Sequence, residues 1–156
     1  MVYVGIDPGK AGGFAVIHPA ESNVEYWAET HYWDEQGFID KIQELAKQYG
    51  TQNIIACVEL VHSMPTDSHK TAFSFGYQTG FIKAVLLSNK ISYQEISPLK
   101  WKKEFNLIKK SKEESIACCK KLYPLVSLFR TNKCKKESDG MAEALLMATY
   151  AKLTKI

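Results

Sequence analysis

The segment YVGIDPGKAGGFAV, residues 3–16, sets an apolar run, a single acid and a glycine-rich turn next to one another. Aspartate is poor at forming strands, and burying its charge without a partner is costly. Asp7 therefore either stabilises a turn or lies where a cation can bind beside it. The apolar residues on the two sides of the Gly12-Gly13 turn predict strands over residues 2–6 and 14–18.

Three further strands are expected downstream. Residues 24–33 alternate with a period of two, which is typical of a strand with one buried face. Residues 54–58, IIACV, are all apolar, as in strands covered on both faces of an α/β sheet. The segment ISYQEI, residues 91–96, predicts the fifth strand.

Five helices are expected between and after these strands. Asp34 caps the first, which ends at Gly50, and Thr66 with Asp67 opens a long helix that reaches about Asn89. A short basic helix begins at Pro98. The next helix begins at a capping box of Ser111 and Glu114 and stops before Pro124, and Ser138 caps the last, over residues 139–153.

The order of these elements predicts one domain over residues 1–156, of the α/β class. A hairpin meander followed by alternating units gives a mixed five-stranded sheet, with three antiparallel strands, then parallel strands, and helices on both faces. No apolar run reaches the ~20 residues of a membrane span, and no basic signal-peptide head is present. These features predict a cytoplasmic, nucleoid-associated protein without a membrane partner.

The four cysteines have neither a CxxC pattern nor zinc-finger spacing, which predicts reduced structural thiols.

Positive charge is concentrated in one third of the chain. Residues 90–136 contain 13 lysine and arginine residues against 4 acidic ones, whereas residues 1–89 contain 5 against 10. A solvated surface would explain any single lysine, but a basic block beside acidic flanks indicates a polyanionic partner, most plausibly nucleic acid.

Four acids are candidates for chemistry. Asp7 follows the first strand and Glu59 follows the apolar fourth strand. Ligands of open α/β sheets gather beyond the carboxyl ends of the strands, which is where both acids fall if these strands are adjacent. Asp139 and Glu143 are one turn apart on one face of the last helix, and its opposite positions can pack on the sheet: Met141, Leu145 and Ala148.

Each acid also has an ordinary explanation. Asp7 could belong only to a turn, Asp139 could only complement the helix dipole, and Glu143 could face solvent. Four acids that converge would repel one another unless divalent cations held them, and oxygen ligands favour Mg²⁺ or Mn²⁺. Two such ions per site can activate a water and stabilise the leaving oxygen in phosphodiester hydrolysis.

The segment GIDPGKA, residues 5–11, invites a comparison with nucleotide-binding loops. Its spacing is one residue short of a phosphate loop, and the Ser or Thr that would hold Mg²⁺ is absent. The turn also resembles the first phosphate motif of actin-like ATPases, but those enzymes close two such domains around a nucleotide. We therefore expect no nucleotide cofactor.

Several of these segments together resemble the RuvC-type Holliday-junction resolvases of the RNase H-like superfamily, in their compact bacterial and phage form. The similarity covers nearly the whole chain, in the segments VGIDPGKAGGFAVI, ACVELVHSMP, FGYQTGFIKAVL, EISPLKWKKEF and SDGMAEALLMA. The resemblance implies an RNase H-like fold and a homodimeric, Mg²⁺-dependent endonuclease that makes paired nicks in a four-way DNA junction.

The resemblance assigns roles to individual residues. It implies that Asp7, Glu59, Asp139 and Glu143 are metal ligands and catalytic groups, with Lys112 among the lysines near the cut phosphate. DNA contacts are expected from the basic segment and from one residue after Glu59: Lys100, Lys102, Lys103, Lys109, Lys110, Lys112, Lys133, Lys135, Lys136 and His62. In the segment that follows Glu59, His62 or Met64 replaces an aromatic residue that family members stack on an unpaired base.

The last helix departs from the family pattern, in which the two acids are three residues apart. Glu143 aligns with the second acidic position, but the residue three before it is Gly140, so Asp139 must serve from one place earlier.

Two other interpretations stay open: a less selective branched-DNA nuclease of the same fold, and a branched-DNA binding protein without catalysis. Retention of all four acids argues against the second, because acids near phosphates weaken binding.

Overall fold

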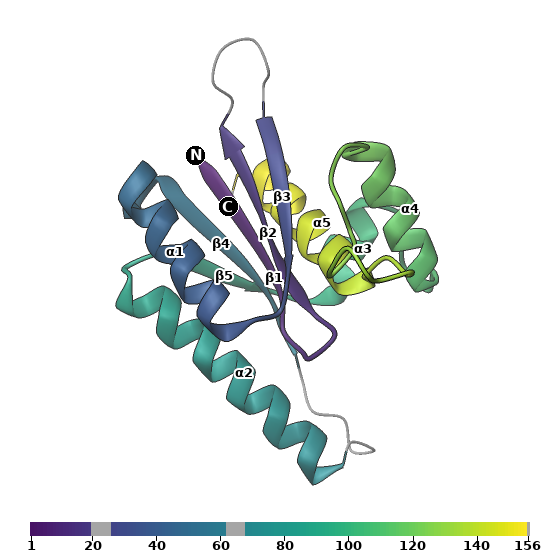
Figure 1. The fold of residues 1–156 in the computed structure, drawn as a ribbon, viewed down its shortest axis with the longest axis horizontal. Coiled ribbons are helices and arrows are strands. Elements are labelled where there is room, and N and C mark those ends of the chain that lie inside the picture. The colour runs from purple at the N-terminus through teal and green to yellow at the C-terminus, as the bar shows by residue number, and fades with distance from the viewer. Residues whose placement is uncertain (20–25, 62–67, 156) are drawn as a thin grey trace.

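The computed structural model, which describes residues 1–19, 26–61 and 68–155, contains a five-stranded mixed sheet (Figure 1). The strand order is β3-β2-β1-β4-β5. The strands are β1 (Val2–Asp7), β2 (Gly13–Pro19), β3 (Tyr26–Tyr32), β4 (Ile54–Glu59) and β5 (Ser92–Ile96). The first three strands pair antiparallel, and β4 and β5 add to β1 in parallel. The predicted sheet is confirmed.

The helices also follow the predicted order. They are α1 (Glu35–Tyr49), α2 (His69–Ser88), α3 (Pro98–Glu104), α4 (Lys112–Leu122) and α5 (Asp139–Thr154), with a short 3-10 helix, η1 (Thr51–Asn53), that was not predicted. Asp34 and Ser138 cap their helices, and Ser111 and Glu114 form the expected capping box. Ser68 caps α2, whereas the predicted opening residues, Thr66 and Asp67, lie outside the described residues.

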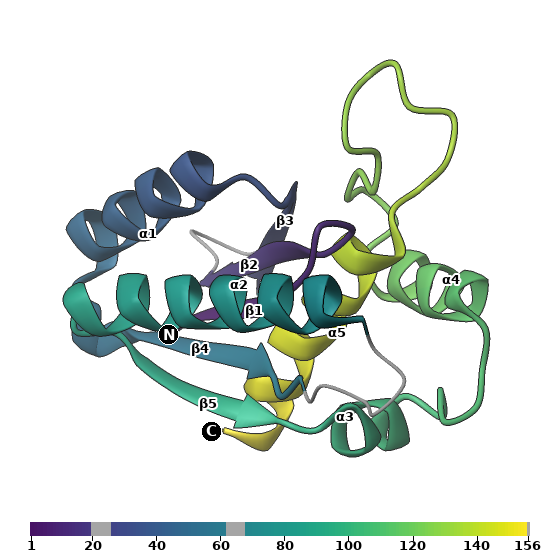
Figure 2. The same cartoon turned by 90° about the horizontal axis from the view of Figure 1, so that it is seen from below.

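Helices cover both faces of the sheet. On one face, α1 and α2 pack on the strands through side chains such as Phe38, Ile42, Ile82 and Leu86. On the other face lies α5, with α3 and α4 packed around it (Figure 2). The loop between α4 and α5 projects beyond these helices in the same view.

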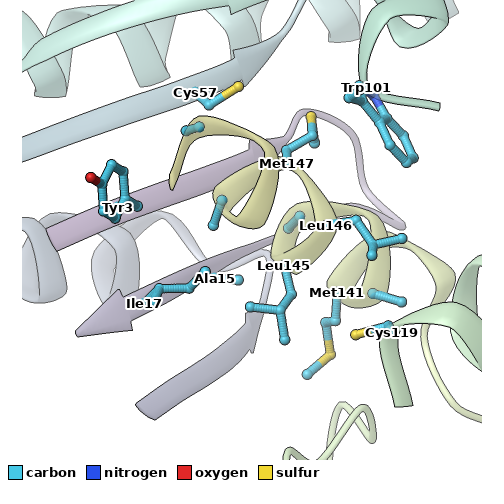
Figure 3. Close-up of a cluster of buried hydrophobic side chains, with 14 of the residues drawn as sticks. Tyr3, Ala15, Ile17, Cys57, Trp101, Cys119, Met141, Leu145, Leu146 and Met147 are labelled. Atoms are coloured by element: carbon cyan, nitrogen blue, oxygen red, sulfur yellow. The ribbon is translucent and has the colours of Figure 1, made fainter. Parts of the chain in front are cut away.

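The helix α5 lies unusually close to β1, because small residues face each other at the crossing. A Cβ atom on Gly5 would lie 1.9 Å from the backbone oxygen of Ala144 and 2.5 Å from the backbone nitrogen of Ala148. Met141 and Leu145 of the same helix are buried, as predicted, and Figure 3 shows them in one cluster with core residues of β1 and β2. Any side chain at position 5 would push α5 away from the sheet.

The four cysteines are free thiols, as expected, and two of them are buried in the core. Burial raises the pKa of both Cys57 and Cys119 to about 12, so these thiols stay protonated at neutral pH. Within the described ranges, no helix has the length and apolar character needed to cross a membrane.

We expect Gly5→Ala to lower the free energy of unfolding by at least about 3 kcal/mol, the upper part of the usual range for overpacking, because the methyl group meets backbone atoms that cannot rotate away. Urea unfolding followed by circular dichroism measures the change. Gly76→Ala is the matched control, because a Cβ there has no heavy atom within 4 Å. A Gly5→Ala protein as stable as the control would contradict the close crossing.

Candidate active site

The sheet register places two acids side by side. Ile6 of β1 is paired with Val58 of the parallel strand β4, and the next residue of each strand is the acid, Asp7 or Glu59. The predicted adjacency of these two strands is therefore confirmed. Both carboxylates lie at the carboxyl edge of the sheet, where open α/β folds place their ligands.

The first turns of α5 bring the other two acids to this edge. Burial raises the pKa of Asp7 well above its usual range, and the negative charges of Glu59, Glu143 and Asp139 raise it further, while Lys112 opposes the rise. The negative charges of the other three acids thus reach Asp7 at the carboxyl edge of the sheet, where the sequence predicts the four acids. Among the described residues, no side chain forms an ion pair or a hydrogen bond with the carboxylate of Asp7.

The structure explains why the acid of the first turn is at position 139 and not at 140. A Cβ atom on Gly140 would lie 2.3 Å from the backbone oxygen of Ala11 and 2.6 Å from the Cα atom of Gly12. Only glycine fits where the start of α5 touches the turn between β1 and β2. An acid three residues before Glu143 is therefore excluded by packing, and Asp139 is the nearest position that can hold one.

Glu59 is held by a residue of the core. The indole Nε1 of Trp101, a fully buried side chain of α3, donates a hydrogen bond of 2.9 Å to Glu59 Oε1. Burial raises the pKa of Glu59, and the negative charge of Glu143 adds to the rise, whereas the Trp101 hydrogen bond and Lys102 oppose it. The rigid indole therefore fixes the direction of this carboxylate.

The two acids of α5 have partners on α3 and α4. Ser115 donates its hydroxyl to Glu143 Oε1 at 3.1 Å, and Lys102 Nζ lies 3.3 Å from the same oxygen. Lys112 forms an ion pair with Asp139, and its hydrogen bond to that acid raises the pKa of the lysine. The predicted lysine near the acids is thus at the site, and its side chain is 72% exposed.

The loop between α4 and α5 brings more cations to this edge. Arg130 donates from Nη2 to the backbone oxygen of Ala11 at 3.0 Å, which ties the loop to the turn after β1. A hollow of about 340 Å³ runs along the loop and reaches Asp139, with Arg130, Lys135 and Lys136 in its lining. A charged polymer lying in this hollow would pass beside the acids.

The remaining lysines proposed for DNA differ in their exposure. The exposed ones are Lys100, Lys103, Lys109, Lys110 and Lys133, and Lys110 is paired with Glu114. Lys102 is partly buried and lies over the ring of Trp101, 5.0 Å from its centroid. His62 and Met64, the candidates for base stacking, lie outside the described residues.

A divalent cation fits the donor chemistry of the site. The donors are carboxylate oxygens without sulfur or imidazole, and Asp7 is a buried acid whose charge lacks a basic contact within the described part of the chain. As the side chains lie, the described residues contain no cluster of three or more His, Cys, Asp or Glu groups close enough to hold a metal ion. Lys112 and Lys102 occupy oxygens of Asp139 and Glu143 instead.

Comparison with known proteins relates this architecture to solved structures. The chain is similar to RuvC of Thermus thermophilus in complex with a Holliday junction substrate, with a TM-score of 0.62, 19% identity and coverage of 98% of this chain and 96% of that one. The structure of Thermus thermophilus RuvC gives a TM-score of 0.59 at 18% identity over 99% and 97% of the two chains.

A viral protein shares the same architecture. The fowlpox virus Holliday junction resolvase matches over 100% of both chains, with a TM-score of 0.52 and 12% identity. The chain has the RuvC fold. No protein-family model and no curated protein sequence matches it.

Three residues that contact the acids or the turn beside them were not singled out from the sequence. Trp101 stands in the basic segment LKWKKEF, where an aromatic among lysines could have been noticed as a core anchor, but nothing local pairs it with Glu59. Ser115 lies inside a helix, and only the packing of α4 on α5 brings it to Glu143. The contact of Arg130 with Ala11 spans 119 residues of sequence, which no local pattern reveals.

The raised pKa of Asp7 predicts a pH-dependent cost of folding without metal. In the folded protein its carboxyl ionises above the usual value of 3.8, so stability is highest below that value, falls as pH rises from there toward the raised pKa, and stays at the lower level above it. Asp7→Asn removes this cost, and we expect a higher melting temperature at pH 7 in EDTA, by about 2–4 °C per kcal/mol relieved.

Thermal unfolding at pH 4 and pH 7 measures the effect. Asp40→Asn, at an exposed acid of α1, is the control and should change little at either pH. If Asp7→Asn does not gain stability relative to wild type between pH 4 and pH 7, the charge of Asp7 is not destabilising.

Proposed function

We propose that the protein is a metal-dependent endonuclease that resolves four-way DNA junctions by paired nicks. One observation carries the proposal: Asp7, Glu59, Asp139 and Glu143 converge at the carboxyl edge of a RuvC-type sheet, beside the basic segment of residues 90–136. A binding protein would gain nothing from four acids next to DNA phosphates, whereas metal-assisted hydrolysis of a phosphodiester uses carboxylates to hold the ions.

In this proposal the four acids hold Mg²⁺, or Mn²⁺, at two positions in each site. When bound, such ions activate water and neutralise the charge that develops on the phosphate. The protein groups define the rest of the site. Trp101 keeps Glu59 in one orientation, and Ser115 does the same for Glu143.

Lys112 supplies a mobile positive charge. Its pairing with Asp139 in the present structure would give way to the scissile phosphate when DNA and cations arrive, because the exposed ammonium can turn toward either anion. Lys100, Lys103, Lys109 and Lys110, with Lys133, Lys135 and Lys136 of the loop, would contact the phosphates that flank the cut.

A gel assay with Asp7→Asn tests the function. Four-way, three-way and linear DNA of matched sequence are incubated with and without Mg²⁺. We expect wild type to nick the four-way junction only with Mg²⁺, and Asp7→Asn to lose at least about 10³-fold in rate while it binds the junction as tightly or more tightly, because its charge no longer repels phosphates. Asp40→Asn should cut like wild type.

Each other outcome identifies an alternative. Equal cutting of all three substrates indicates a nuclease without junction selectivity, and junction binding without cutting in any metal indicates a binding protein. If Asp7→Asn cuts at the wild-type rate, the carboxylate of Asp7 is not needed for cleavage, and the proposed role of the acids is wrong.

We also propose that the protein acts as a homodimer through α2, because paired symmetric nicks need two equivalent sites. One face of α2 is buried against the sheet through Ile82, Val85 and Leu86. The opposite face carries the large apolar side chains Phe73 and Tyr77, which are 79% and 55% exposed. Exposed apolar stripes of this kind mark protein interfaces.

Light scattering at micromolar concentration measures the oligomeric state. The double variant Phe73→Glu/Tyr77→Glu should convert a dimer to a monomer with an unchanged far-UV circular dichroism spectrum. Leu125→Glu is the matched control, because Leu125 is 98% exposed on the loop far from α2 in sequence. A monomeric wild type, or a double variant that stays dimeric, would reject this interface.

A further inference from the structure

A pocket of about 260 Å³ lies between the turn after β1 and the N-terminal half of α2. Gly9 and Lys10 of the turn line one part, and Lys70, Ser74, Phe75 and Gln78 of α2 line the other. A Cβ on Gly9 would lie 3.4 Å from Phe75 Cε1, so turn and helix are in contact here. The pocket is separate from the four acids, but its turn begins only two residues after Asp7.

Gln78 is the feature that points to a ligand. Its side chain is 6% exposed, and its Oε1 atom is buried without a hydrogen-bond partner among the described residues. Buried amide oxygens almost always have a partner, and leaving one without a donor is costly. A molecule that enters the pocket with an N–H group would satisfy this oxygen.

The charge and shape of the pocket narrow the class of that molecule. Lys10 and Lys70 are two of only 5 basic residues in the first 89, a segment with 10 acidic residues, and both line this one pocket. Their ammonium groups favour an anion, and Phe75 offers an aromatic ring to a planar group. The volume is several times the ~30 Å³ of one water molecule. A phosphate joined to a planar base with an N–H edge meets all these conditions.

We propose that this pocket takes one unpaired nucleotide of the DNA strand that passes Asp7, and that Gln78 selects its base. The base lies against Phe75 and donates an N–H to Gln78 Oε1, and its phosphates lie near Lys10 and Lys70. The glutamine amide donates and accepts side by side, the pattern that adenine matches, so adenine is the favoured base. This inference rests on the proposed junction cleavage and adds base selection to it.

The location is tested without catalysis. Four-way junctions that carry photoreactive 8-azidoadenine at successive positions from the branch point are bound to the wild-type protein in EDTA and irradiated. Trypsin cleaves after Lys70 and Lys83, so residues 71–83 are released as one peptide that contains both Phe75 and Gln78. We expect one probe position to cross-link to Phe75 or its neighbours in this peptide. Cross-links confined to other peptides would overturn the proposal.

Base selection is tested by Gln78→Met, which keeps the length of the side chain and removes the acceptor. On junctions with a randomised base at the cross-linking position, wild type should prefer adenine, and the variant should lose at least about 5-fold of that preference. Gln94→Met, at an exposed position of β5, is the control and should keep the preference.

The outcomes separate the two proposals. Because Gln78→Met removes a buried acceptor without a partner, its melting temperature should equal or exceed that of wild type, which excludes misfolding as the cause. An unchanged base preference in a folded Gln78→Met protein would overturn base selection. If no protein cuts any junction, the proposed function fails, and the cross-linking experiment alone decides whether the pocket holds a nucleotide.

Discussion

The close crossing of α5 over β1 at Gly5 is the constraint on which the other features depend. With no side chain at that position, the backbone of α5 at Ala144 and Ala148 rests against the strand. The same close approach continues to the start of the helix, where Gly140 meets the turn at Ala11 and Gly12. Because the helix lies this low, Asp139 and Glu143 reach the edge where Asp7 and Glu59 end their strands. The small residues at this crossing, Gly5, Ala144 and Ala148, thus determine where the acids of α5 lie.

Around this frame, buried side chains determine which way the acids point. Trp101 and Ser115 have no charge and are buried, yet they hold Glu59 and Glu143. The lysines at the same edge balance the charge of the acids, and they differ in exposure. The side chain of Lys112 is mostly exposed and can exchange partners, whereas Lys102 is partly buried over the ring of Trp101. The site therefore combines oriented carboxylates with at least one exposed cation, Lys112, an arrangement suited to a substrate that is itself an anion.

The sequence predicted the fold well because its signals were local: alternation in β3, the apolar run of β4, and the caps at Asp34, Ser111 and Ser138. The four acids were found for the same reason: Asp7 and Glu59 end strands, Asp139 opens the last helix, and Glu143 lies one turn later on that helix. The groups that orient them could not be found, because contacts such as Trp101 with Glu59 and Arg130 with Ala11 depend on the packing of distant segments. The glycine at position 140, where the family pattern has an acid, is explained by packing, because a side chain there would meet the backbone of Ala11 and Gly12.

The crossing of α5 over β1 also has a consequence during protein synthesis. The strand that carries Asp7 leaves the ribosome before the helix that carries Asp139 and Glu143, which follows more than a hundred residues later. Domains generally fold as units during synthesis, so the face of the sheet that α5 covers stays open until this helix has emerged. The four acids come together only when the last helix docks. A nascent chain therefore cannot assemble this site until α5 has been translated.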